Sequence, residues 1–404
     1  MNNSCAEMAA SQNSGPNSGP GHATPFAPEF DLLLSSARTT PHQAHIKALA
    51  AVGIDWHGFL GLAARHRVRP LVYKALRATC WDCIPADVKV KWEETHRYLI
   101  AGNLLLAGEL LRIIAEFEAA GIQAAAMKGA AIAAMAYGDL TLREYEDIDL
   151  LVQERDFTRA VELLQQLGYQ PFWKYDSRKV LRFLRHVGEY PLMNPARRTA
   201  IDLHWRVATK ATALSPRTSD FPAGFQPFPL AGATILTFAP SELPLYLAAQ
   251  GGWDQWADLR RICDLAEFLR KFPDADWEPP MLAARRLGGL RSMLTGLSLA
   301  SSLLGAEIPA PAVRGIDADQ TVSRLAEESK LLLQSEPGSG EAVRRYLFQL
   351  SARQGLPGKI ALAYSILMDR TAQDGNWIML PRPLWWLYGL LRPLRAGRKL
   401  LRRN

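Results

Sequence analysis

The chain has 404 residues, and 48% of them are apolar, which is enough apolar material for two or three folded domains. Its formal charge is +7, but residues 377–404 hold seven of the 47 basic side chains and no acidic ones, which leaves 40 basic against 40 acidic side chains elsewhere. A neutral body argues against a nucleic-acid-coating surface, which needs a basic patch on the fold itself. Four scattered cysteines exclude a disulfide framework.

Residues 1–28 are rich in Ser, Asn, Gly and Pro and predict a disordered leader. The segment lacks the basic and apolar regions of a signal peptide, and the sparse cysteines fit a reducing compartment, so we expect a cytoplasmic protein. Cys80 and Cys83 form a C-x-x-C pair, but no second Cys or His pair accompanies them. A structural role for the pair is therefore favoured over metal binding or redox chemistry.

Apolar residues recur at helical spacing from residue 29 to 120 and predict an N-terminal helical region. The clearest stripe contains Leu106, Leu110 and Ile113, and Gly121 stands where a glycine would end that helix.

The apolar pattern of residues 121–210 differs from that of the preceding helical region and predicts a small α+β core. The expected elements are a strand ending near Lys128, a helix over 130–137, a strand over 147–152, a helix over 156–167 and a hairpin turning at Asn194-Pro195. Gly138 and Gly168 would end the two helices.

Two carboxylates stand one residue apart in the strand expected over 147–152. Side chains alternate along a strand, so Asp147 and Asp149 would lie on one face. At about 4 Å they would repel by about 4 kcal/mol at an effective dielectric near 20. A divalent cation, a nearby Arg or Lys, or a position at the wet end of the strand would each offset this repulsion.

A third carboxylate, Asp202, follows in "AIDLHWRV", where it shares a polar face with His204 and Arg206. Three converging carboxylates suit two Mg²⁺ ions, which prefer oxygen ligands and can stabilise both oxygens of a phosphoryl transfer. Solvated carboxylates at the start of a loop are the alternative, and they would need no metal.

Lys128 and Gly129 lie between the first expected strand and its helix. A glycine there lets the backbone approach a phosphate, the helix start offers free N–H groups, and Lys128 adds a point charge.

The stretch "MKGAAIAAMAYGDLTLREYEDIDLLV", followed by "AIDLHW", resembles the uncharacterised bacterial nucleotidyltransferase family within the polymerase-β-like nucleotidyltransferase superfamily. Three flanking stretches, residues 55–76, 256–269 and 380–395, are also similar to that family. The resemblance covers most of the chain from about residue 45. It implies a small mixed sheet backed by helices, Mg²⁺, and transfer of a nucleoside monophosphate from an NTP with release of pyrophosphate.

The resemblance also assigns roles to individual residues. Asp147 and Asp149 match the metal-binding D-x-D, and Asp202 matches a third carboxylate that helps to deprotonate the acceptor hydroxyl. Gly129 matches the glycine of the nucleotide loop, with Lys128 beside it. Two positions depart from the pattern: Ala130 replaces a Ser or Gly, and Gln250 replaces a frequent His.

Each of several further residues has two possible roles. Arg143 would contact the triphosphate or neutralise the acidic cluster. His204 would assist catalysis or, as we favour, make a structural hydrogen bond. Arg260 and Arg261 would face the site or, by default, the solvent.

Beyond the core, the sequence predicts a Pro-rich connection over 211–238, a C-terminal helical region over 239–375 and a basic aromatic tail over 376–404. The uncharged stretch 384–391 within the tail is far shorter than the roughly 20 residues that span a membrane. The tail would therefore lie on an anionic membrane surface or dock its aromatic residues on the body.

The sequence thus predicts an α+β protein with a nucleotidyltransferase core between helical regions, acting on an NTP and a hydroxyl-bearing acceptor. A non-catalytic nucleotide sensor or docking protein on the same fold is the alternative, which the missing Ser at position 130 leaves open. A sugar, an antibiotic, a peptide product, a protein hydroxyl and an RNA end all stay open as acceptors, with the neutral body arguing mildly against RNA.

Overall fold

A computed structural model describes residues 27–172, 188–208, 212–221, 224–336 and 341–368, with the single residues Leu380, Leu384 and Leu387. The expected leader, apart from its last two residues, and the basic tail, apart from those three leucines, lie outside the described residues.

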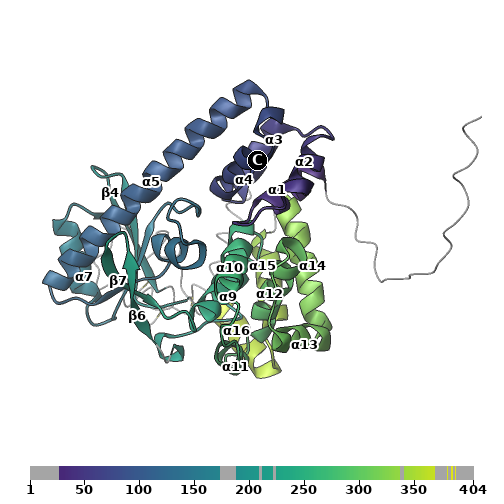
Figure 1. Cartoon of the computed structure of the whole chain (residues 1–404). Coiled ribbons are helices and arrows are strands. Elements are labelled where there is room, and N and C mark those ends of the chain that lie inside the picture. The colour runs from purple at the N-terminus through teal and green to yellow at the C-terminus, as the bar shows by residue number, and fades with distance from the viewer. Residues whose placement is uncertain are drawn as a thin grey trace, which may run out of the picture.

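The N-terminal region is helical, as predicted. It contains α1 (Pro28–Ser36), α2 (Gln43–Ala50), α3 (Trp56–Arg65), α4 (Arg69–Thr79), a 3₁₀ turn η1 (Trp81–Cys83) and α5 (Ala86–Ala119). Figure 1 shows α5 reaching from the other N-terminal helices across to the sheet. It ends where predicted, because Gly121 adopts a φ of +66° and Ile122 N–H donates to the Phe117 carbonyl at 2.8 Å.

Among the described helices, α5 has the length and apolar composition that a membrane span would need, with 39% of its apolar window buried inside the protein. The core helices of globular proteins pass the same test. Its buried stripe packs on the sheet through Leu106, Leu110, Ile113 and Phe117. Packing on the sheet accounts for this stripe, and one such helix is only weak evidence for a membrane.

The central sheet is small and mixed, in agreement with the predicted α+β class. Its five strands run in the order β1-β2-β5-β4-β3, and β2 and β5 pair in parallel while all other neighbours are antiparallel. The strands are β1 (Ala124–Ala126), β2 (Ile148–Val152), β3 (Gln170–Pro171), β4 (Glu189–Asn194) and β5 (Thr199–His204).

The helices between these strands are also confirmed. The first consists of α6 (Ala130–Ile132) and a π-helical turn η2 (Ala133–Tyr137), and the second is α7 (Phe157–Gln166). Gly138 and Gly168 follow them with φ values of +70° and +90°, a conformation that glycine adopts at little cost. The hairpin turns as predicted, since Asn194 pairs with Thr199.

The sheet has one apolar face and one mixed face because its side chains alternate. Ile148, Leu150 and Val152 of β2 join the apolar cluster formed with α5 and α7, whereas Leu151 joins the cluster of the C-terminal helices. The second face, which carries Asp149, therefore looks toward the C-terminal helices.

The segment expected as a Pro-rich connection contains a β-hairpin, β6 (Phe225–Leu230) and β7 (Ala233–Phe238). Pro227 and Pro229 obscured it, because proline cannot donate to a ladder and so argues against a strand. They are tolerated because these two strands form a sheet of their own, in which one edge of β6 needs no donors. Thr237 of β7 donates to the carbonyl of Ala126 at 2.7 Å and joins the hairpin to β1.

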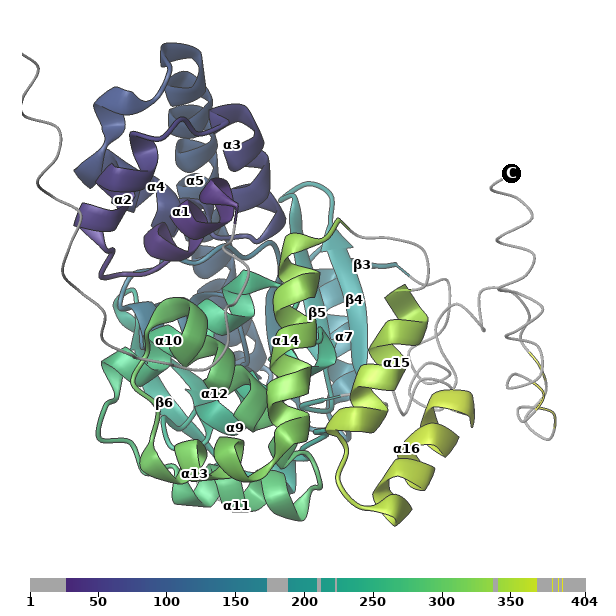
Figure 2. The ribbon, with the colours of Figure 1, turned by 90° about the vertical axis from the view of Figure 1, so that its right-hand side faces the viewer.

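The C-terminal region is a bundle of helices (Figure 2). Its members are α9 (Leu243–Trp253), α10 (Leu259–Lys271), α11 (Glu278–Arg286), α12 (Leu290–Leu304), α13 (Ala310–Ala318), α14 (Gln320–Gln334), α15 (Glu341–Ala352) and α16 (Leu356–Met368). Trp256 is fully buried at its centre, against Gly251 of α9 and Gly296 of α12, where any Cβ would clash with the indole ring. This packing fixes how α9 and α10 stand beside the sheet.

Candidate active site

The parallel pairing of β2 with β5 sets Asp149 directly opposite Asp202. The sequence predicted these two carboxylates on neighbouring strands, and the register confirms that placement. The prediction that Asp147 lies inside the strand is wrong, because β2 begins at Ile148. Asp147 stands one residue before the strand and is half-buried, whereas Asp149 is 3% exposed.

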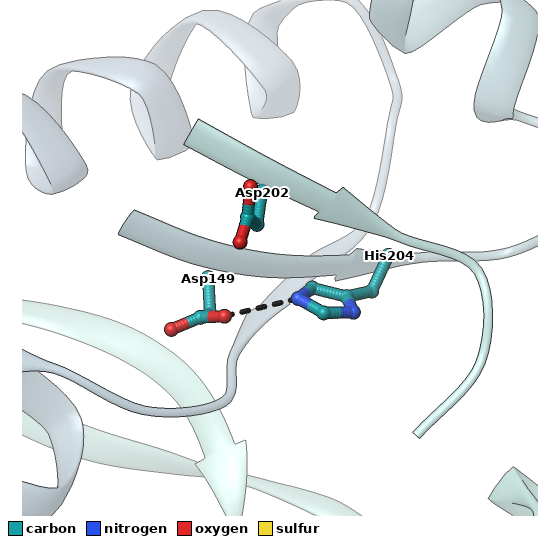
Figure 3. A group of neighbouring side chains, drawn as sticks. All are labelled: Asp149, Asp202 and His204. Carbon is teal, nitrogen blue, oxygen red and sulfur yellow. Dashed lines mark hydrogen bonds and ion pairs between the residues drawn. The ribbon is translucent and has the colours of Figure 1, made fainter. Parts of the chain in front are cut away.

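Asp149 is held between a lysine and a histidine. Its Oδ1 accepts from Lys128 Nζ at 2.7 Å and lies 3.0 Å from His204 Nε2 (Figure 3). Burial alone would raise the pKa of Asp149, but the Lys128 charge and the His204 hydrogen bond outweigh it and lower that pKa below its ordinary value. His204 therefore makes a hydrogen bond, as the favoured interpretation expected.

The other two carboxylates lack such compensation. Burial, followed by repulsion from Asp149 and Glu189, raises the pKa of Asp202 to about 7. Burial and the Asp149 charge also raise the pKa of Asp147. Two acids that resist ionisation beside a third that is ionised indicate a site with too little positive charge for its carboxylates.

Asp149, Asp202 and His204 have ligand atoms that all lie within 4.8 Å of one another (Figure 3). The described part of the chain offers no other such group of His, Cys, Asp or Glu. Carboxylate oxygens are the ligands that Mg²⁺ prefers, and Asp149 Oδ2 makes no hydrogen bond among the described residues. The donor set therefore fits a divalent cation, although the Asp147 carboxylate lies outside this group.

Lys128 and Gly129 form the turn between β1 and α6. Gly129 adopts φ +56° and ψ −121°, which only glycine takes up readily. A Cβ at this position would come no closer than 3.4 Å to the Tyr145 ring, so the backbone angles, not lack of space, require the glycine. A small pocket opens beside this turn, lined by Lys128, Gly129, Asp147 and Asp149 and walled by Leu106 and Leu110 of α5.

The structure does not bring Arg143 to the carboxylates. Its guanidinium is 1% exposed and makes a two-point ion pair with Asp264 of α10, at 2.7 and 2.9 Å. Tyr137 donates to the same carboxylate at 2.8 Å. Arg143 therefore anchors the loop that leads into Asp147, and no contact supports its predicted nucleotide-binding role.

Arg260 and Arg261 do not form a solvated face, so the prediction that both face the solvent is wrong. Arg260 is 7% exposed and donates to the Glu144 carbonyl at 2.9 Å. Arg261 is partly buried and donates from Nε to Asp254 at 3.2 Å. Burial and the Asp149 charge dominate the pKa of Lys128, and the Arg261 charge acts to lower that pKa.

Sequence reasoning missed two residues that matter here. Asp264 holds Arg143, and Tyr246 of α9 has a buried hydroxyl without a hydrogen-bond partner among the described residues. Both sit in helices whose local pattern is ordinary, so no signal short of the tertiary contact distinguishes them.

The chain belongs to the family described as uncharacterised nucleotidyltransferase, whose profile matches residues 53–305. A solved antigenic nucleotidyltransferase-like protein from Paracoccidioides brasiliensis is similar at 16% identity, with a TM-score of 0.28 over 52% of this chain and 95% of that one. No curated protein matches this chain. The resemblance noted from the sequence is confirmed at the level of this family.

Proposed function

We propose that this protein transfers a nucleoside monophosphate from an NTP to a hydroxyl-bearing acceptor, with two Mg²⁺ ions and with release of pyrophosphate. The observation that carries the proposal is the register that sets Asp149 opposite Asp202, beside the Lys128-Gly129 turn. Membership of a nucleotidyltransferase family supports the same reaction class. The polymerase-β-like superfamily of the resemblance is the parent class that we propose.

In this reaction the acceptor oxygen attacks the α-phosphorus, the bond from that phosphorus to the pyrophosphate oxygen breaks, and the acceptor proton passes to Asp202 or to water. Asp147, Asp149 and Asp202 would hold the metal ions. Bound Mg²⁺ would neutralise the phosphates and the carboxylates together. Gly129 brings the backbone close to a phosphate, and Lys128 supplies a cation beside it.

The packing around the site keeps these groups in place. Arg69 of α4 holds Glu144 through an ion pair at 2.5 Å, and Arg143 holds Asp264. The loop before Asp147 is thereby tied to the N-terminal helices and to α10. Precise placement of carboxylates requires such rigid support.

The test is isothermal titration of the four NTPs with and without Mg²⁺, on the wild type and on Asp147→Asn/Asp149→Asn. Metal-dependent binding that the double variant loses supports the site. Asp202→Asn should then keep NTP binding and abolish pyrophosphate release with any active acceptor. An absence of NTP binding by the wild type would contradict the proposal and favour a non-catalytic protein on this fold.

A further inference from the structure

Tyr246 of α9 has a hydroxyl without a hydrogen-bond partner among the described residues. The side chain is fully buried, with 0% of its surface exposed. Its ring stacks on Phe238 of β7 at 4.4 Å between ring centroids, so its orientation is fixed. A buried tyrosine hydroxyl normally has a partner, because leaving it unsatisfied costs free energy.

Tyr246 lies close to the Lys128 turn. Its stacking partner Phe238 follows Thr237, which donates to the carbonyl of Ala126 at 2.7 Å, two residues before Lys128. Burial is the main cause of the raised pKa of Tyr246, and the charges of Lys128, Asp149 and Arg261 also act on that pKa. Lys128 donates one of its three N–H groups to Asp149. Arg261 donates from Nε to Asp254, and its two terminal nitrogens donate to no other described residue. Donors without a described protein partner are therefore present on Lys128, Arg261 and Tyr246.

We propose that Tyr246, Lys128 and Arg261 bind the donor phosphates that leave as pyrophosphate. Three groups with unused donors, two of them cationic, match an anionic polyphosphate. The inference rests on the proposed function, and it assigns the leaving-group side of that reaction to α9 and α10.

The strand order indicates that these three residues face the leaving phosphates and not the acceptor. Lys128 follows β1 and Asp202 lies on β5, on opposite sides of the β2 strand that carries Asp149. An in-line displacement places the attacking and leaving oxygens on opposite sides of the phosphorus. With the acceptor beside Asp202, the leaving phosphates fall on the Lys128 side, where Tyr246 stands.

The experiment compares the full-length wild type with Tyr246→Phe, which removes only the hydroxyl and keeps the ring on Phe238. Tyr137→Phe is the matched control, because the Tyr137 hydroxyl is also buried but has a partner, Asp264. Mg²⁺-pyrophosphate, ATP and AMP are titrated into each protein, and thermal unfolding is measured without ligand.

We expect Tyr246→Phe to bind Mg²⁺-pyrophosphate and ATP roughly tenfold more weakly, with AMP binding unchanged. Its melting temperature should equal or exceed that of the wild type, because the lost hydroxyl had no partner. Tyr137→Phe should bind all three ligands as the wild type does and melt at a lower temperature.

Two results would overturn the assignment: pyrophosphate binding by Tyr246→Phe within twofold of the wild type, or an equal loss for AMP. Either result would leave the proposed function standing if the wild type binds ATP in a Mg²⁺-dependent way. A wild type that binds none of the three ligands would overturn the proposed function itself.

Discussion

Replacing Lys128 with methionine should destabilise the fold, because it leaves Asp149 as a buried carboxylate without its cation. The Lys128 and Asp149 side chains are 18% and 1% exposed, and their charged atoms lie 2.7 Å apart. At an effective dielectric of 20, this distance gives an attraction of roughly 6 kcal/mol. Desolvation of both groups offsets part of that attraction. We therefore expect a loss of about 3–5 kcal/mol in the free energy of unfolding, typical of breaking a buried pair.

The pH dependence of this loss follows from the direction of the two pKa shifts. Burial opposes both charges, yet the pair lowers the pKa of Asp149 below the ordinary 3.8 and raises that of Lys128 above the ordinary 10.5. A lowered carboxyl pKa stabilises the fold above about pH 4, and a raised amine pKa stabilises it below about pH 10.5. The difference between wild type and variant should therefore be largest between these limits and shrink as the pH falls below 4.

The assay is urea unfolding of both proteins at pH 7 and pH 3, in metal-free buffer. Lys74→Met is the matched control, because Lys74 is exposed on α4 and its loss should change the free energy of unfolding by less than about 0.5 kcal/mol. If Lys128→Met were as stable as this control at pH 7, the reasoning that Asp149 is ionised and buried in the folded protein would be refuted.

Three further predictions concern stability. Arg143→Met should lose roughly 3–5 kcal/mol in urea unfolding, because it leaves Asp264 charged and buried, and Arg143→Met/Asp264→Leu should recover part of that loss; equal stability of the two variants would contradict this. Gly129→Ala should cost about 1–3 kcal/mol through its backbone angles alone, measured by thermal melting; an unchanged melting temperature would contradict this. Burial, aided by Arg65, lowers the pKa of His66 from 6.5 to about 4, so acidification from pH 6.5 to 4 should remove up to about 3 kcal/mol. His66→Gln should lose this part of the pH slope, and an unchanged slope would show that another group causes it.

The local elements of the core and the identity of its carboxylates follow from the amino-acid sequence alone. Helix ends at Gly121, Gly138 and Gly168 were predictable, because a left-handed residue after a helix favours glycine whatever surrounds it. The alternation around Asp149 and Asp202 was predictable for the same reason, since side chains alternate in any strand.

Pairing between residues far apart in the sequence depends on how the helices and the sheet pack together. Arg143 meets Asp264 across 121 positions, and Lys128 meets Asp149 across 21, although other acids stand closer to each in sequence. Partner choice depends on which helices pack on the mixed face of the sheet, and local periodicity does not encode it. The hairpin β6–β7 was also not predictable from local sequence, because its two prolines are acceptable only where one strand edge stays unpaired.

The candidate active site depends on both the sequence and the packing. The sequence contains three aspartates and a Lys-Gly turn, but each of these could equally belong to a solvated loop without a function. The parallel register of β2 and β5 sets Asp149 opposite Asp202, and the helices packed over that face bury Asp149 beside Lys128. Burial removes the water that would otherwise screen the charges, so their chemistry comes from the packing and not from the motif.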